Sequence, residues 1–472
     1  MGVESEHPLY SKNRLDWEDI ETALGGQRAI KFKNTLYLPY TSGMIEADKL
    51  KLDPKGRVYS GYLARAQYPE WVRDSVRSMI GLVSRINPKY ELKHKQLDIL
   101  EEKATDDGFD LKELFVRLVS KGVEFGRYGL LSEFDDSSEP YITIYDASNI
   151  INWRINAVGG RRDATMIVLR EYHLKGDDEF SNETETKYRV LDLDEMGFYR
   201  VRIFDSSGVL ENTIEPKMGS KRLNFIPFTF GGSINNNIEP NPIPLLTMAQ
   251  AAIKSYQLSA DYFQSLYMTA HPQPYAVGVD PVAVTDDDGN TTYESPLRMT
   301  GAICLWELPQ GATVNYLEIQ GNGIALTKTE LESQKNAALE SGAKVIDAGS
   351  NESGEARKAR QDDQHATLHT IVSAAASAIE QAIKYLALWL GKTDEGIQFE
   401  AALEFNADVN PQILAGITAM AQSGKISWET VYDYIQTGKI SKRTYDEEID
   451  KMLENDASLP LTNRTQNNQD ID

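Results

Sequence analysis

The chain has 472 residues with 41% hydrophobic and 25% charged residues, which excludes disorder over its whole length and allows a sizeable core. Its formal net charge of −22 is opposite to that of proteins that grip DNA phosphates, so a nucleic acid partner would have to pass without tight binding. A single cysteine, Cys304, excludes an intramolecular disulfide and a multi-thiolate metal site and favours a reducing compartment.

No secretory signal is expected, because the N-terminus lacks a basic region followed by an apolar stretch. No apolar run reaches the roughly 18 residues of a membrane helix, so no membrane partner is expected.

The first third of the chain begins with a mixed, turn-rich stretch to about Pro69. Two amphipathic helices are predicted after it. The first runs from about Trp71 to Arg85 and the second from about Leu111 to Phe125. Asp110 is the expected N-cap of the second helix, and Glu113 stands at the capping-box position.

The middle of the chain has the pattern of a β-sheet. From Tyr141 to Phe230, short runs rich in Val, Ile, Leu and Tyr are separated by turns that contain glycine. These runs predict an antiparallel meander.

The following part of the chain predicts long helices around a strand-rich insert. A helix of roughly 40 Å is expected over 244–269, and strand-like segments with turns over 274–320. A helix is expected to restart near Thr327, where Thr327 with Glu330 and Thr329 with Glu332 fit capping boxes, and to run to about Lys344.

A polar loop bounded by glycines comes next, over 347–354. The longest helical pattern then runs from about Glu355 to Leu390 and includes a stripe of alanines that would let another helix approach closely. Gly391 is expected to end it. Shorter helices are predicted over 411–423, 428–437 and 441–453, and a disordered polar tail over 462–472.

Motifs for chemistry are weak throughout. Gly391-Lys392-Thr393 resembles the end of a phosphate-binding loop, but the required upstream glycine falls at Leu386, so a helix cap is favoured. His365 and His369 are four residues apart on a helix, yet Ala366 stands where a zinc hydrolase has Glu, and a polar helix face is favoured over a metal site.

The aspartate run 286–288 and Cys304 are two further candidate sites, and for both a structural role is favoured over a chemical one. The run of three aspartates from Asp286 to Asp288 lacks the ligand spacing of a calcium loop and is expected to be a solvated hairpin tip. Cys304 lies in an apolar run and is expected to be a buried thiol rather than a nucleophile. We therefore predict no catalytic, cofactor-binding or metal-binding residues, and no enzymatic activity.

The order of these elements resembles that in the portal (head-to-tail connector) proteins of tailed bacteriophages. The order is a helix, a β-rich insert, a second helix, a polar loop and a very long helix. Local motifs in the same order support the resemblance: His7-Pro8-Leu9-Tyr10, Pro140-Tyr141, Asn149-Ile150-Ile151-Asn152-Trp153-Arg154, Ile226-Pro227-Phe228 and Glu352-Ser353-Gly354-Glu355-Ala356.

The resemblance implies an α+β subunit with a β-containing wing, long stem and channel helices, a small α/β clip and a helical C-terminal crown. The implied domains are a wing (1–241), a stem helix (242–269), a clip (270–325), a second stem helix (326–346), a tunnel loop (347–354), a long channel helix (355–391), a crown (392–462) and a disordered tail (463–472).

In function, the resemblance implies a homo-oligomeric ring, typically of 12 subunits, at one capsid vertex of the virion, assembled in the host cytoplasm. Double-stranded DNA would transit its centre. The expected partners are the terminase large subunit, head-completion or tail adaptor proteins, and the major capsid and scaffolding proteins. An acidic wall would repel the DNA polyanion, so the charge of −22 is compatible with a conduit and also with no DNA at all.

The site residues expected from this resemblance belong to two loops. Gly349, Ser350, Asn351, Glu352, Ser353 and Gly354 would form the tunnel loop, and Asp286, Asp287, Asp288, Gly289 and Asn290 an exposed, partner-facing clip tip. Two alternatives stay open: another structural adaptor of a capsid or tail, and a metal-dependent hydrolase that uses His365 and His369 with Asp362 or Asp363.

Overall fold

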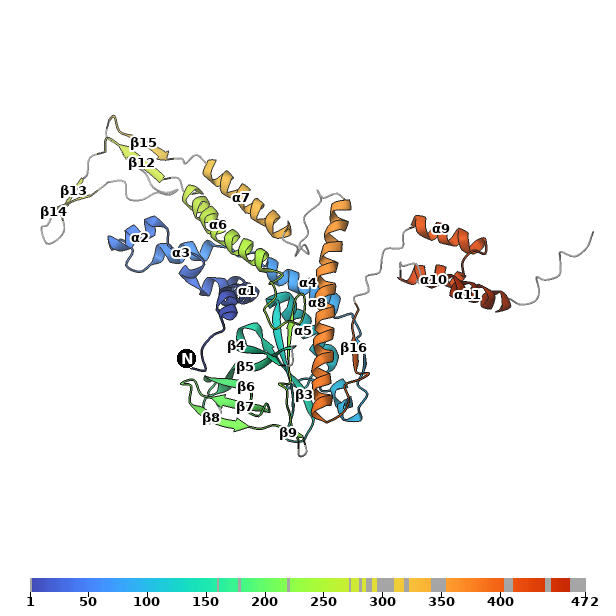
Figure 1. Ribbon diagram of the computed structural model, residues 1–472. Helices are drawn as coiled ribbons and strands as arrows, with labels where there is room; N and C mark the ends of the chain where they lie inside the picture. Colours follow the sequence, from blue (N-terminus) through green and yellow to red (C-terminus); the bar gives the residue numbers. More distant parts are fainter. Residues whose placement is uncertain are drawn as a thin grey trace, which may run out of the picture. The chain divides into compact units, whose positions relative to one another are not determined.

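The chain divides into two units, Met1–Ala402 and Leu403–Asp472 (Figure 1). Helices and strands are both abundant, as expected for the α+β class. The computed structural model describes residues 2–158, 161–176, 180–218, 221–270, 273–279, 282–285, 291–294, 310–317, 322–340, 354–402, 411–437 and 443–458.

The first unit begins with helices, and the predicted turn-rich lead-in is wrong. Helix α1 spans Pro8–Phe32 with a kink at Gly26, whose φ is 75°. Its apolar stripe is sparse and glycine interrupts it, which explains why periodicity alone missed it. The next three helices are α2 (Ser42–Lys49), α3 (Arg57–Arg65) and α4 (Trp71–Val83).

Helix α5 spans Leu111–Phe125, as its sequence predicts. The Asp110 carboxylate accepts a hydrogen bond from the backbone N–H of Glu113 at 2.7 Å, which confirms the predicted cap. The Glu113 carboxylate pairs with Arg117 at 3.5 Å.

Two antiparallel sheets follow, which confirms the predicted β-rich region but corrects its topology. The last strand of the region returns beside the first, so one sheet has the order β11-β2-β3 and the other the sequential order β4-β5-β6-β7-β8. The strands are β2 (Arg127–Phe134), β3 (Pro140–Asp146), β4 (Ile150–Val158), β5 (Arg161–Leu174), β6 (Thr184–Leu193), β7 (Tyr199–Phe204), β8 (Leu210–Ile214) and β11 (Phe228–Gly232).

Helix α8 (Gly354–Trp389) is the central core element of this unit and packs on α5, β2 and β11. From Leu368 onward, its alanine-rich face is buried. The Ser132 hydroxyl of β2 donates to the carbonyl of Ala382 at 2.9 Å. A Cβ on Gly122 of α5 would lie 2.8 Å from the Ile371 side chain, so the predicted close approach of another helix is confirmed.

The C-terminal part of α8, Ala366–Trp389, is long and apolar enough to cross a membrane, but 61% of it is buried within the protein. Because α8 packs against helix α5 and strands β2 and β11, it is a core helix of this unit. Its end is set by Gly391, whose φ is 68° and whose neighbour Lys392 donates its N–H to the carbonyl of Ala387 at 2.9 Å. The interpretation of this glycine as a helix cap is confirmed.

Short strand pairs complete the first unit. They are β1 (Lys89–Glu91) with β16 (Gln398–Glu400), β9 (Lys217–Met218) with β10 (Lys221–Arg222), β12 (Gln273–Val277) with β15 (Thr313–Leu317), and β13 (Val282–Thr285) with β14 (Thr291–Glu294). Because β16 pairs with β1, the first residues of the predicted crown belong to this unit.

The second unit contains α9 (Pro411–Gln422), α10 (Trp428–Thr437) and α11 (Tyr445–Ser458). Its small core contains Ile417, Ala421, Val431 and Tyr434. The predicted start of the last helix at Ser441 is wrong, because Thr444 caps α11: its N–H donates to the Glu447 carboxylate at 2.8 Å, with the reciprocal bond at 3.5 Å. The predicted disordered tail lies outside the described residues.

His7 ties the N-terminus to β4. Its N–H donates to the carbonyl of Ile151 at 2.9 Å, and its ring stacks on Trp153 with centroids 3.9 Å apart. Its Nδ1 accepts from the N–H of Leu9 at 3.2 Å and so caps α1. Burial and the neighbouring Arg127 guanidinium lower the pKa of His7.

Acidification should therefore weaken this attachment. A lowered folded-state pKa means that the contribution of His7 to stability is present above its unfolded pKa of about 6.5 and is lost as pH falls through the folded pKa. Between pH 7.5 and 5, His7→Asn should remove part of the pH dependence of the free energy of unfolding, by up to about 1 kcal/mol, the size of an N-cap. Denaturant titrations of both proteins at several pH values measure this, and identical slopes would contradict it.

Candidate functional site

The two loops predicted as functional lie almost wholly outside the described residues. Of the tunnel loop Gly349–Gly354 only Gly354 is described, as the first residue of α8. The clip tip Asp286–Asn290 is not described, but β13 and β14 on either side of it pair through Thr285 and Thr291, as a hairpin requires. Cys304 also lies outside the described residues.

The long helices that flank the predicted insert are α6 (Leu246–Ala270) and α7 (Asn322–Glu340), which pack along each other. The N-terminal half of α6 is buried against α1, α3 and α4. Near its middle, the Tyr62 hydroxyl donates to the Asp261 carboxylate at 2.6 Å. Past that point the helix is more open, and Tyr267 and Met268 are exposed.

Helix α7 differs from its prediction in where it begins. It starts at Asn322, five residues before Thr327, so Thr327 and Thr329 are not caps. Their hydroxyls instead donate to the carbonyls of Gly323 and Ala325 within the helix, at 3.0 and 3.1 Å. Most described side chains of α7 are exposed, and Leu326 is 73% exposed.

Within the described residues, no group of three or more His, Cys, Asp or Glu side chains is placed to hold a metal ion. His369 is exposed on α8, and the side chains of His365, Asp362 and Asp363 lie outside the described set.

A buried ion network lies between the two sheets of the first unit. The Arg189 guanidinium bonds the Glu133 carboxylate and lies 3.5 Å from Glu171. The Glu171 carboxylate also accepts a hydrogen bond from the Tyr145 hydroxyl at 2.6 Å and lies 3.0 Å from Nε2 of His173. Burial raises the pKa of Glu133, and Arg189 opposes this shift. We assign this network to stability.

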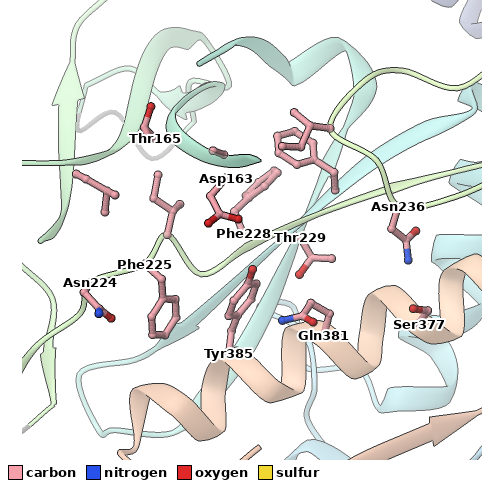
Figure 2. A pocket seen from close by; sticks show the side chains of 15 residues that line it. Asp163, Thr165, Asn224, Phe225, Phe228, Thr229, Asn236, Ser377, Gln381 and Tyr385 are labelled. Atoms are coloured by element: carbon pink, nitrogen blue, oxygen red, sulfur yellow. The ribbon is translucent and has the colours of Figure 1, made fainter. Parts of the chain in front are cut away.

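A cavity of about 490 Å³ lies between α8, β5, β11 and the segments on either side of β11 (Figure 2). Helix α8 contributes side chains from one face, at spacings of four residues. The lining residues are Asp163, Ala164, Thr165, Leu193, Asn224, Phe225, Ile226, Phe228, Thr229, Phe230, Asn236, Ile238, Ser377, Gln381 and Tyr385. Nothing in the sequence pattern indicated this cavity, because its walls come from segments far apart in the chain.

Aromatic rings and polar groups share the walls of this cavity. Phe225 stacks on Tyr385 with centroids 5.3 Å apart. Figure 2 shows the Tyr385 hydroxyl and the Asp163 carboxylate pointing toward each other. Burial, with a further contribution from Asp163, raises the pKa of Tyr385, so its hydroxyl is neutral.

Two polar atoms at the wall are buried without a partner among the described residues, the Thr229 hydroxyl and Oδ1 of Asn236. The Asn236 amide nitrogen is already committed, because it donates to the carbonyl of Ala374 at 2.9 Å. The Oδ1 atom of Asn236 is therefore a buried hydrogen-bond acceptor that has no donor among the described residues.

Removing the unpartnered hydroxyl should stabilise the protein. Thr229→Val keeps the shape of the side chain and should raise the free energy of unfolding by about 1 kcal/mol, because a buried polar group without a partner carries its full desolvation cost. Thr229→Ser keeps the hydroxyl, loses a methyl group and should destabilise. Thermal unfolding of the three proteins tests this order, and a less stable Val variant would show that the hydroxyl has a partner.

Comparisons with known proteins give limited matches. A family model described as a domain of unknown function (DUF4055) matches residues 244–390, which covers α6, the strands of the insert, α7 and α8 but less than half of the chain. No curated protein matches.

Among solved structures, the chain is similar to one from the virion of a native gene transfer agent particle, with 14% identity and a TM-score of 0.39 over 79% of this chain and 90% of that chain. A chain from the neck of an empty gene transfer agent particle gives 13% identity and a TM-score of 0.38 over 79% and 91%. Likeness this distant does not establish a shared function.

Proposed function

We propose that this chain is a structural protein of a phage-like particle and, more specifically, the subunit of its portal, the head-to-tail connector. The observation that carries the proposal is the helix pair α6–α7. Helix α7 packs along α6 and leaves most of its described side chains exposed, including Leu326. A helix gains most of its stability from packing an apolar face. Neighbouring copies in a closed ring would cover this surface through heterologous contacts.

The sequence supports the same proposal through the order of its elements, in which a strand-rich insert separates α6 from α7 and a glycine-bounded loop precedes α8. In the proposed ring of about 12 subunits, the loop 349–354 faces passing double-stranded DNA. The clip tip 286–290 faces the terminase large subunit and later the head-completion or tail adaptor proteins.

The proposed subunit has no enzymatic activity and no cofactor, and ATP hydrolysis belongs to the terminase. It resides at the portal vertex of the virion, in contact with major capsid and scaffolding proteins, after assembly in the host cytoplasm. The charge of −22 suits a wall that must not grip a polyanion.

Negative-stain electron microscopy of the purified protein tests the proposal. Rings with a central hole are expected for the wild type. Leu326→Asp should fold normally, because the side chain is 73% exposed in the single chain, but should prevent ring formation by placing a charge in the contact between copies. Leu174→Asp, at a leucine of β5 that is 66% exposed, is the matched control and should still form rings.

Small monodisperse particles of the wild type would overturn the portal proposal and favour another structural adaptor of the capsid or tail. If the Leu326→Asp protein forms rings as well as the wild type, the proposed ring would stand, but α7 would not be part of the contact between subunits.

A further inference from the structure

The cavity beside α8 has a lining whose charge and hydrogen-bonding groups select one kind of ligand. Among the described residues, the 15 that line it include one carboxylate, Asp163, and no lysine, arginine or histidine. Its other polar groups are neutral, and the unpartnered Oδ1 of Asn236 requires a donor. An anionic ligand would meet a carboxylate and acceptors, so the lining disfavours it.

The aromatic rings of the lining favour a cationic ligand. The stacked rings of Phe225 and Tyr385 line the cavity together with the single carboxylate, and the face of an aromatic ring is electron-rich. Ammonium and guanidinium groups bind favourably over such faces and gain a charge-assisted hydrogen bond from a carboxylate. Both features lie at the same end of the cavity, where Asp163 and Tyr385 converge in Figure 2.

The buried Arg127 fixes the direction of the ligand. Its guanidinium lies 4.9 Å from the ring of Phe230, and its Nη1 donates to the carbonyl of Ile238, so a positive charge already stands behind that wall. A cationic group is therefore favoured beside the Asp163 carboxylate and disfavoured against the Phe230 ring. The Thr229 hydroxyl and Asn236 Oδ1 are then available to uncharged or weakly charged donors further along.

We propose that this cavity is a binding site for an alkyl ammonium or alkyl guanidinium group, with Asp163 as the charge partner and the Phe225–Tyr385 pair as the aromatic wall. The group is either a free small cation or the side chain of a lysine or arginine presented by a protein segment. The site goes beyond the proposed portal function and does not depend on it, because every lining residue belongs to one chain.

Calorimetric titration of the full chain tests the proposal with two probes. Agmatine carries the guanidinium as a free small molecule, and the capped peptide Gly-Gly-Arg-Gly-Gly carries it as a protein side chain. Saturable binding of either one is expected. Binding of agmatine alone identifies a free cation as the ligand, and binding of the peptide identifies a protein side chain.

Variants locate the site. Asp163→Asn removes the charge at constant shape and should weaken binding about tenfold or more, which is the usual loss for one charged hydrogen-bond partner. Asp136→Asn, at an exposed aspartate in the turn between β2 and β3, is the matched control and should bind as the wild type does. Thr229→Val should also weaken binding, and since it removes no fold contact it keeps the test valid if Asp163→Asn unfolds.

Three results would overturn the proposal. They are the absence of saturable binding of both probes, equal affinities of the Asp163→Asn and Asp136→Asn proteins, and binding of the uncharged analogue butylurea as tight as that of agmatine. None of these results bears on ring formation, so this proposal and the portal proposal fail separately.

Discussion

Arg189→Met should lower the free energy of unfolding of the first unit by about 3–5 kcal/mol. The Arg189 side chain is 19% exposed, and its guanidinium compensates the carboxylates of Glu133 and Glu171, whose side chains are 10% and 17% exposed. Without it, two acidic groups close to each other are left inside the protein. One of them must protonate or draw in water, and either response costs stability.

Denaturant unfolding monitored by tryptophan fluorescence measures this loss. The double variant Arg189→Met with Glu133→Gln should recover part of it, because it removes the carboxylate that Arg189 compensates most directly. Lys187→Met is the control. Lys187 stands two residues earlier on β6 and pairs with Glu185 and Glu211 at the surface, so its loss should change stability little. Equal effects of Arg189→Met and Lys187→Met would show that the network is not stabilising.

Deleting Ser350–Ser353 should leave ring assembly intact and reduce DNA-filled particles to near background. This second large effect rests on the proposed function. If the loop between α7 and α8 faces passing DNA, as proposed, its removal should impair how the duplex is held and guided. The measurement is nuclease-protected DNA per particle in a packaging system, together with electron microscopy of the rings.

A length-preserving variant separates the chemistry of this loop from its presence. Replacing Ser350, Asn351 and Ser353 with alanine keeps the backbone and Glu352, and should retain most of the packaging. Normal packaging after the deletion would remove the loop from the DNA path. Loss of rings would instead assign it to assembly.

The sequence correctly predicted those helix ends that are set by a capping residue. Asp110 caps α5 and Gly391 ends α8 at the positions that the sequence indicates, because a cap depends on groups within four residues of one another. Short runs rich in Val, Ile, Leu and Tyr likewise indicated strands in both sheets, namely β3, β5 and β6. The same reasoning failed for α7, since Thr327 and Thr329 satisfy a capping pattern yet bond to carbonyls inside a helix that began earlier.

Helix α1 shows a different limit. Its buried face includes Tyr10, Trp17 and Ile20, but the positions between the first two on that face are the polar Asn13 and Arg14, so the apolar stripe is interrupted. The stability of the helix comes from partners elsewhere in the chain. The Trp17 indole donates to the carbonyl of Phe125 at 3.1 Å, a contact across 108 residues that no local pattern contains. Tertiary packing made this segment a helix where intrinsic signals were weak.

The sequence by itself determined the α+β class, the order of long helices around a strand-rich insert, the acidic charge and the resemblance that motivates the portal proposal. Each of these depends on composition or on neighbouring residues. Only the tertiary structure decided that the alanine face of α8 meets Gly122 and the strands β2 and β11, and that Asp163 and Tyr385 share a cavity. Such contacts join residues separated by more than 120 positions, and they follow from how the sheets and α8 pack together rather than from any local preference.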